Sequence, residues 1–363
     1  MPLISVTGSQ NIYIQDYTAS ISSYGNPTLR WEKTGAVDLG VDFDMFKGRM
    51  FGKFDFYNKK GRDLIVSMSI PAVNGTKTQK LNMAEMTNRG FEFELGTTNK
   101  FSGNNIVWTG SVNFSYNYNV IDKLFKATYN AYDLYGGGTA AYVQGYDANT
   151  LWAFKYAGVV NQGTESNPNW QPVVQGEGDD LYDFTGWTPG DGRDYMLDMG
   201  TKVAPVGIGL INTFKIYDFD LSFIFTGKFG HKFNGLIFNY PSMSGGSALP
   251  NKLYNEILNS DPSKMVPIPF GKDEPRYYFW DRFYPYLDYR VQSANHLRMQ
   301  ELSVAYNVNP LLLRKIGLRS AKVYGQANNL FVLTNNKYNE DPEFPMGSLK
   351  PRPTLTFGLN LTF

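Results

Sequence analysis

The feature that most constrains this chain is a strict alternation of apolar and polar residues near its C-terminal end. In residues 354–363 every second residue is apolar, and those between are threonine, glycine or asparagine. A period of two places the two kinds of residue on opposite faces of a β-strand, whereas a helix needs a period near 3.6. The segment therefore predicts a strand with one apolar face, formed by Leu355, Phe357, Leu359, Leu361 and Phe363.

The same alternation recurs along the chain and predicts an all-β fold of about ten strands. Two tight connections, at residues 47–49 and 217–218, are typical of β-hairpins. Around residues 297–304 the phase slips by one residue, which predicts a β-bulge. The one short helix that we expect covers Leu311 to Ile316. The predicted strands lie near residues 34–46, 49–60, 86–97, 105–119, 150–158, 203–216, 219–231, 295–308, 320–333 and 353–363.

Short turns alternate with long connections in this pattern, and the longest lie at residues 159–200 and 230–293. Transmembrane β-barrels of outer membranes have this asymmetry, whereas a β-sandwich usually has short loops at both ends. Aromatic residues make up 16% of the chain. They gather toward predicted strand ends, as interfacial girdles would, at Trp108, Tyr116, Tyr118 and Trp152. An antiparallel transmembrane barrel and a large soluble sandwich with an aromatic core both remain open at this point.

Composition removes several other classes of protein. The chain has no cysteine and only two histidines, which excludes thiol catalysis, disulfides and a multi-histidine metal centre. Its net charge of +1 offers no basic excess for nucleic acid. No run of about 18 apolar residues predicts a transmembrane helix.

Four groups of residues are candidate sites. Glu92 and Glu94 alternate on one strand face, as paired catalytic carboxylates could, but the polar side of a barrel wall explains them more simply. The segment 189–194 is rich in glycine and aspartate without matching a calcium loop, so calcium is possible but unsupported, and we expect no cofactor. His231 and His296 lack metal ligands at suitable spacing and are expected at strand ends.

The fourth group is a run with seven aromatic residues in ten positions, at 277–286 in the longest connection. Exposed rings can stack on sugar faces, and neighbouring acidic and basic groups can bind hydroxyls. Packing within the loop or against a partner protein is the alternative. The candidate residues for substrate contact in this run are Tyr277, Tyr278, Trp280, Asp281, Arg282 and Tyr284.

Several segments together resemble the SusC/RagA-like TonB-dependent outer-membrane transporters, in the order of that family and from about residue 26 to the end. The resemblance rests on residues 26–34 (NPTLRWEKT) with 39–43, 88–92 (NRGFE), 214–222 (FKIYDFDLS), 296–306 (HLRMQELSVAY), 323–334 (VYGQANNLFVLT) with 341–343 (DPE), and 357–363 (FGLNLTF). The last strand, with Phe357, Leu359, Leu361 and the terminal Phe363, also resembles the signal that the barrel-assembly machinery of the outer membrane reads.

The resemblance implies a fold and a domain assignment. Residues 1–363 are expected to be the C-terminal part of a TonB-dependent receptor barrel, about ten strands of a barrel with about 22, bearing long extracellular loops. The plug domain and the N-terminal signal of such transporters are not recognised in this sequence; its first residues have neither the basic nor the apolar region of a signal peptide.

The resemblance also implies a function without covalent chemistry, so we do not expect an enzyme. It implies TonB-dependent import of oligosaccharides or peptides across the outer membrane of a Bacteroidota-type Gram-negative bacterium. The implied partners are a SusD-like surface lipoprotein, the TonB–ExbB–ExbD complex acting through the N-terminal parts, and outer-membrane lipid. A passive porin-like barrel and a soluble carbohydrate-binding β-sandwich are the alternatives.

Overall fold

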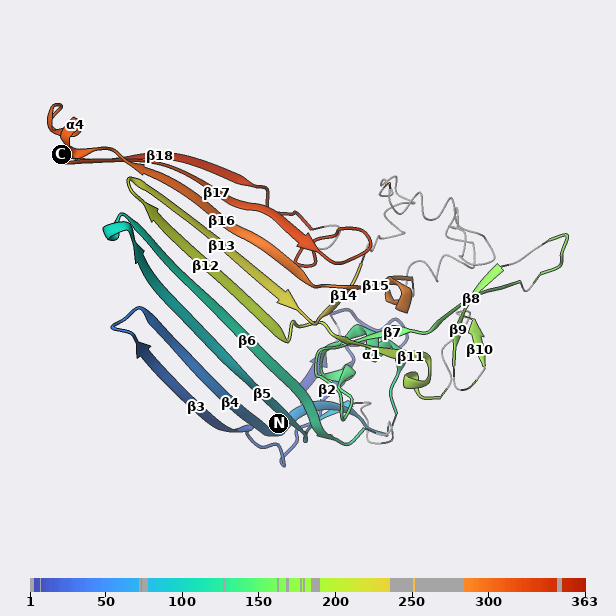
Figure 1. Ribbon diagram of the computed structural model, residues 1–363. Helices are drawn as coiled ribbons and strands as arrows, with labels where there is room; N and C mark the ends of the chain where they lie inside the picture. Colours follow the sequence, from blue (N-terminus) through green and yellow to red (C-terminus); the bar gives the residue numbers. More distant parts are fainter. Residues whose placement is uncertain are drawn as a thin grey trace.

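Nine long strands pair side by side in one antiparallel sheet, which dominates the computed structural model (Figure 1). Their order across the sheet is β18-β17-β16-β13-β12-β6-β5-β4-β3. Within the described part of the chain, the edge strands β3 and β18 each pair on one side only. The nine strands are β3 (Lys33–Met45), β4 (Met50–Ser69), β5 (Thr78–Phe101), β6 (Ile106–Leu124), β12 (Val206–Ile216), β13 (Phe219–Phe229), β16 (His296–Asn307), β17 (Ser320–Thr334) and β18 (Thr354–Thr362).

The structure describes residues 3–363 except 7, 72, 74–77, 127, 162, 168–169, 177, 179, 184–189, 236–250, 252–283 and 345–347. Among the residues described, no helix has the length and apolar character needed to cross a membrane.

Tight turns join consecutive strands at one end of the sheet. The β3–β4 turn carries three successive positive φ angles, at Phe46 (56°), Lys47 (59°) and Gly48 (77°). Glycine adopts this left-handed region without steric cost, and the Gly48 N–H donates to Asp44 Oδ1 at 2.9 Å. The β12–β13 turn needs only two residues, one of them Tyr217 at φ 54°. Both hairpins predicted from the sequence are confirmed.

Long connections leave the opposite end of the sheet and carry the smaller elements (Figure 1). Residues 125–205 link β6 to β12, and residues 230–295 link β13 to β16, yet both strand pairs are direct neighbours in the sheet. These elements are α1 (Ala131–Gly136), β7 (Thr150–Phe154), β8 (Tyr156–Asn161), β9 (Trp170–Gln175), β10 (Leu181–Asp183), β11 (Met196–Thr201), β14 (Lys232–Asn234) and β15 (Val291–Ser293). Two further short strands, β1 (Leu3–Val6) and β2 (Ala19–Ser23), precede β3.

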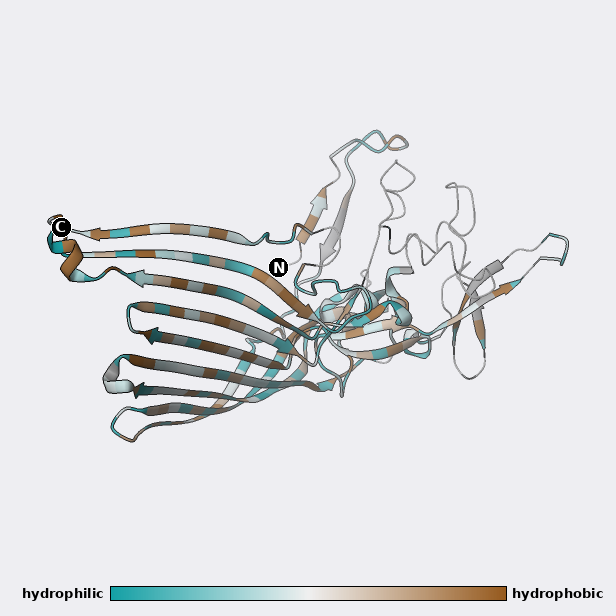
Figure 2. Cartoon of the chain, turned by 45° about the horizontal axis from the view of Figure 1, so that its top comes forward, coloured by the Kyte–Doolittle hydropathy of each residue, from teal (hydrophilic) through white to brown (hydrophobic). Residues whose placement is uncertain are grey.

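The two faces of the sheet differ in chemistry because residues paired across strands share a face. One rung runs through Val41, Phe54, Phe93, Phe114 and Ile208. The rung on the other face runs through Asp42, Lys53, Glu94, Asn113, Gly209 and Thr226. Figure 2 shows this alternation as brown and pale or teal bands along each strand.

The apolar face is not covered by another layer of the described structure. Phe357 is 82% exposed and Leu39 is 64% exposed on it. The buried core lies instead at the end with the long connections, where Val66, Ala84 and Ile121 are at most 2% exposed. A sandwich would bury its apolar face against a second sheet, so the sandwich alternative is wrong for this fold.

Most of the predicted elements are present. The bulge is confirmed, since the β16–β17 register shifts between Met299 and Glu301, and the short helix is α4 (Pro310–Arg314). Nine of the predicted strands form the sheet, but the tenth, at 150–158, is wrong as a wall strand. That segment divides into β7 and β8, which pair in separate small sheets. Trp152 lies in β7 with 4% exposure, so it is no part of a surface girdle.

Candidate functional site

The polar face of the sheet brings together side chains from five neighbouring strands, β4, β5, β6, β12 and β13. Two adjacent rungs hold them, because the strand register aligns alternate polar positions. The first rung contains Lys53, Glu94, Asn113, Gly209 and Thr226. The second contains Asp55, Glu92, Ser115, Gly207 and Lys228.

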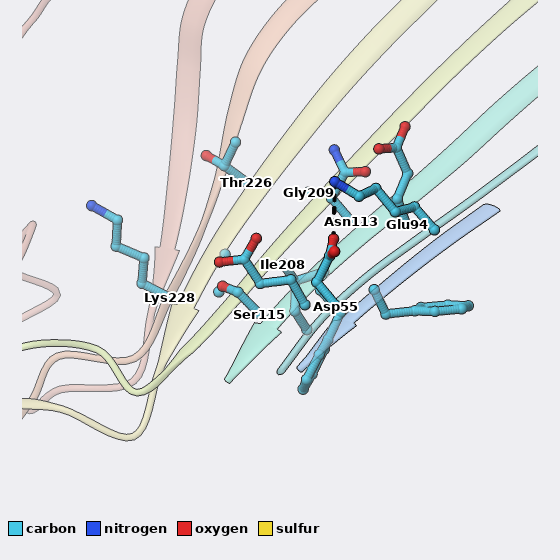
Figure 3. Close-up of a pocket in the computed structure, with 14 residues that line it drawn as sticks. Asp55, Glu94, Asn113, Ser115, Ile208, Gly209, Thr226 and Lys228 are labelled. Atoms are coloured by element: carbon cyan, nitrogen blue, oxygen red, sulfur yellow. Dashed lines mark ion pairs between the residues drawn. The ribbon is translucent and has the colours of Figure 1, made fainter. Parts of the chain in front are cut away.

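Two glycines open a hollow in the middle of these rungs (Figure 3). Gly207 and Gly209 put no side chain on the polar face of β12, and a Cβ at Gly207 would lie 2.7 Å from Ser115 Oγ. The hollow has a volume of about 420 Å³ and is open to solvent. Its sides are formed by the longer side chains of β4 and β5 and by Thr226 and Lys228 of β13.

The hollow offers both charges and several neutral hydrogen-bonding groups. Asp55, Glu92 and Glu94 lie on one side of it and Lys228 lies on the other. Lys53 Nζ is 3.1 Å from Asp55 Oδ2, an ion pair with side chains 53% and 34% exposed. Such solvated pairs contribute little to stability. The hollow therefore combines charged and hydrogen-bonding groups with apolar surface. The paired carboxylates lie on the solvated polar face, as the simpler interpretation predicted.

A buried charge network lies where the β17–β18 connection meets the ends of β13 and β16. Arg298 Nη2 donates to both carboxylate oxygens of Asp341 at 2.8 Å. Both side chains are nearly buried, at 6% and 5% exposure. Arg298 also contacts Glu343, with Nη2 3.0 Å from Oε2. Arg298 Nε also donates to Glu343 Oε2 at 3.1 Å. Charge-assisted hydrogen bonds are stronger than neutral ones, so this network holds the connection against the wall.

Lys228 joins the network to the hollow. Its ammonium group donates to Glu343 Oε1, while the residue also lines the hollow. His296 is buried beside them, with Nε2 3.7 Å from Glu343 Oε1. His296 Nδ1 lies 2.9 Å from the Ala294 carbonyl oxygen. A carbonyl oxygen can only accept, so Nδ1 carries the proton.

His231 completes the network from the segment after β13. Its ring centroid is 6.0 Å from that of His296, and it is 9% exposed. Within the described residues, no group hydrogen-bonds its Nδ1. Burial, the His296 ring and the Lys228 charge lower the pKa of His231 to about 4. This histidine is therefore neutral near pH 7.

Glu343 remains ionised in the same surroundings. Burial alone would raise the pKa of Glu343. The hydrogen bond from Lys228 and the charges of Lys228 and Arg298 outweigh that effect and hold the pKa below its usual range. The network thus pairs an ionised carboxylate with fixed cations next to a neutral histidine.

The connecting segments form a second cluster of aromatic and polar groups. Tyr135 stacks on Tyr286 with ring centroids 4.2 Å apart, and Phe154 packs against Tyr135. Nearby, burial raises the pKa of Tyr156 to about 12 and raises that of Asp288 above its usual value. With Lys155, Gln175, Arg193 and Asp194, these two residues line a polar hollow of about 470 Å³.

The glycine- and aspartate-rich segment is described from Gly190 onward and forms a turn into a 3-10 helix (Gly192–Tyr195). The Asp191 carboxylate accepts from Arg193 Nε at 3.0 Å and from Arg193 Nη2 at 2.8 Å. Burial raises the pKa of Asp191, but the bonds from Arg193 lower it further than burial raises it. In the part of the chain that the structure describes, no three acidic or histidine side chains are grouped as metal ligands.

Most of the aromatic run expected to contact substrate lies outside the described residues. This applies to Tyr277, Tyr278, Trp280, Asp281 and Arg282. Tyr284 begins a 3-10 helix (Tyr284–Tyr286), and only its backbone is described. Tyr286, from the same run, packs on Tyr135 within the connections. The role of the six candidate residues stays a prediction.

The residues expected to form the assembly signal lie along β18. Phe357, Leu359 and Leu361 share the apolar face, with exposures of 82%, 60% and 39%. Phe363 follows the end of the strand and is 79% exposed. The strand pattern is confirmed, whereas its reading by the assembly machinery stays a prediction.

Sequence reasoning missed the buried charge network. Asp341 and Glu343 were noted only as part of a family-like segment, and the two histidines were expected singly at strand ends. Strand order, rather than any local motif, brings residues near 228–231, 296–298 and 341–343 together. No single-sequence signal marks such a meeting.

Known proteins resemble this chain in sequence. The family model for "TonB dependent receptor-like, beta-barrel" matches residues 5–201. The TonB-dependent receptor SusC of Bacteroides thetaiotaomicron is 25% identical over 367 residues, covering 96% of this chain and 33% of that protein. TonB-dependent receptor P3 of Formosa agariphila is 25% identical over 369 residues, covering 94% and 35%. The chain thus spans about a third of the length of the curated relatives it matches.

Solved structures share the fold. The RagAB peptide transporter matches with a TM-score of 0.69 and 22% identity, covering 100% of this chain and 38% of that chain. The RagAB peptide importer in its open-open state matches with a TM-score of 0.67 and 21% identity, with the same coverage.

We predict that Arg298→Met destabilises the protein by about 3–5 kcal/mol, because it leaves Asp341 buried without its cation. Lys322→Met is the matched control, since it removes a 2.9 Å pair with Asp220 whose side chains are 43% and 30% exposed. The control should cost less than about 1 kcal/mol. Urea unfolding in detergent micelles measures both, and equal losses would contradict a structural role for the buried pair.

The lowered pKa of His231 predicts a pH dependence. An unfolded histidine titrates near 6.5 and the folded one near 4, so the unfolded state binds more protons between these values. Stability should therefore fall as pH drops from about 6.5 to 4. Glu343 adds to the loss at lower pH, where its depressed pKa is reached. His231→Gln should flatten the slope between pH 6.5 and 4.5 in urea unfolding, and a slope as steep as that of the parent would show that His231 does not titrate this way.

Proposed function

Because this chain belongs to the TonB dependent receptor-like β-barrel family, we propose that it forms part of the wall of an outer-membrane nutrient importer. The observation that carries the proposal is the nine-stranded antiparallel sheet with an uncovered apolar face and a polar, hollowed face. A barrel wall needs such a sheet, since its outer residues face hydrocarbon and its inner residues face water or a plug.

The orientation follows from the connections. Outer-membrane barrels place short turns in the periplasm and long loops outside the cell. The 46–49 and 217–218 turns would then be periplasmic, and the connections 125–205 and 230–295 extracellular. The buried charge network would lie at the extracellular rim of the wall.

Import in this proposal depends on parts beyond the wall. The TonB–ExbB–ExbD complex would supply energy through a plug domain, and a SusD-like surface lipoprotein would cover the extracellular connections. The substrate would be an oligosaccharide or a peptide. The relative SusC, named a TonB-dependent receptor, supports energy coupling through TonB. RagAB, described as a peptide importer, supports a peptide as the substrate. The wall itself would perform no covalent chemistry.

Two sets of residues take roles in this proposal. The aromatic run at 277–286, with Tyr277, Tyr278, Trp280, Asp281, Arg282 and Tyr284, would present a surface to substrate or lipoprotein. Phe357, Leu359, Leu361 and Phe363 would direct the last strand to the barrel-assembly machinery. Exposed rings suit sugar stacking, and exposed alternating apolar residues suit insertion.

Adjacent residues on opposite faces of β12 test the membrane placement. Leu210→Arg puts a charge in the middle of the apolar face and should cost about 2–4 kcal/mol in lipid. Ile211→Arg puts the same charge on the polar face and should cost little. Heat-modifiable mobility and urea unfolding from vesicles measure both variants. Equal effects would contradict a lipid-facing apolar surface.

The import function is tested by uptake of labelled oligosaccharides and peptides into cells of the source organism. Uptake should fail when the gene or TonB is deleted, and Trp280→Ala should lower it at least several-fold while barrel assembly is unchanged. Trp31→Ala, in an exposed residue outside the aromatic run, is the control. Uptake that survives loss of TonB would instead indicate a passive porin, and equal loss of uptake and assembly in Trp280→Ala would favour packing of the run within the loops.

A further inference from the structure

On β4, β5 and β6, the apolar band of the outward face gives way to polar residues toward the long connections. Its last rung holds three aromatic side chains, Phe56, Phe91 and Tyr116, on β4, β5 and β6. The next rung holds Asn58, Arg89 and Tyr118, with Val37 beside Asn58 on the edge strand β3, and Lys60 lies one rung further on β4. We call the four residues Asn58, Lys60, Arg89 and Tyr118 the cationic border.

Arg89 is the centre of the cationic border. Its side chain is exposed, and its guanidinium carbon lies 4.9 Å from the centroid of the Tyr118 ring. No acidic group of the described residues forms an ion pair with Arg89. Stacking on a ring holds the guanidinium plane in place and leaves its edge N–H groups free to donate.

The neighbouring cations differ from Arg89 in this respect. Lys60 Nζ lies 3.5 Å from Glu85 and 4.0 Å from Asp122, and Lys33 Nζ lies 3.4 Å from Asp63. Lys60 and Arg89 are diagonal neighbours across β4 and β5, and the Cα atoms of such a pair lie about 7–8 Å apart. Lys60 can therefore share an anion with Arg89, although its charge is partly offset by two carboxylates.

We propose that the cationic border binds the phosphate of a membrane-lipid headgroup, with Arg89 as the principal contact. The inference rests on the proposed function, which turns this face toward lipid. A guanidinium presents paired N–H donors that match two phosphate oxygens, and Asn58, directly opposite Arg89 on β4, adds an amide donor.

The occupant is a lipid rather than a soluble anion because the border continues directly into the apolar band. Phe56, Phe91 and Tyr116 are 39%, 36% and 36% exposed immediately beside it. A molecule that covers both regions must carry an anionic head and apolar chains. Arginine and tyrosine at the edge of an apolar band are also the side chains that lie at headgroup level in membranes.

The test uses the protein as its gene encodes it, purified in a neutral detergent and titrated with phosphatidic acid or, separately, with phosphatidylcholine. Native mass spectrometry reads the fraction of protein that retains lipid. Arg89→Gln should weaken phosphatidic acid binding about fivefold and leave phosphatidylcholine binding unchanged. Arg89→Lys keeps the positive charge but not the planar guanidinium, so its affinity for phosphatidic acid should lie between those of the parent and Arg89→Gln. Arg314→Gln is the matched control, since this exposed arginine lies in α4 at the other end of the sheet.

Each outcome decides a different point. Parent-like binding of phosphatidic acid by Arg89→Gln would overturn the lipid site and leave the membrane function standing. Equal weakening by Arg314→Gln would also overturn it, because the attraction would then be unspecific. A parent protein that stays monodisperse without detergent and retains neither lipid would overturn the proposed function and this inference together. Heat-modifiable mobility of each variant shows that a loss of lipid is not a loss of the barrel.

Discussion

A continuous ladder of main-chain hydrogen bonds across nine strands is what allows one face of this sheet to stay apolar without a covering layer. Each inner strand satisfies its backbone N–H and C=O groups on its two neighbours. The outward face then shows only side chains, and no polar backbone has to be desolvated there. The same ladder sets the register, so a slip of one residue would move every aromatic side chain to the polar face.

This register lets neighbouring residues of one strand serve two different surroundings. Phe93 belongs to the apolar face, and Glu94, the next residue, borders the hollow on the other. The hollow exists because β12 carries Gly207 and Gly209 on the polar face while Ile208 keeps its apolar side chain on the opposite one. Side-chain size on one face can therefore vary without weakening the other face.

The wall strands could be predicted from the sequence because each one alternates apolar and polar residues, as β18 does over Thr354–Thr362. It failed at 150–158 for a physical reason. All five residues of β7 are buried, Thr150 and Trp152 included. A short buried strand can be predicted from its apolar residues, but without a clear alternation its sequence does not show which sheet it joins. The buried charge network could not be predicted from the sequence, because only the strand order and a long connection bring Arg298 and Asp341 together. Of the aromatic run, the structure locates the side chain of Tyr286 in the packed connections.

The position of Lys228 links the polar hollow to the rim of the wall. Its ammonium group is bonded to Glu343, yet the residue lines the hollow beside Gly207. An anionic group in the hollow would compete with Glu343 for this cation. Glu343 would still have Arg298 at 3.0 Å, but Arg298 also holds Asp341. A buried carboxylate without a cation is costly. An anionic group in the hollow would therefore weaken the attachment of the β17–β18 connection to the wall.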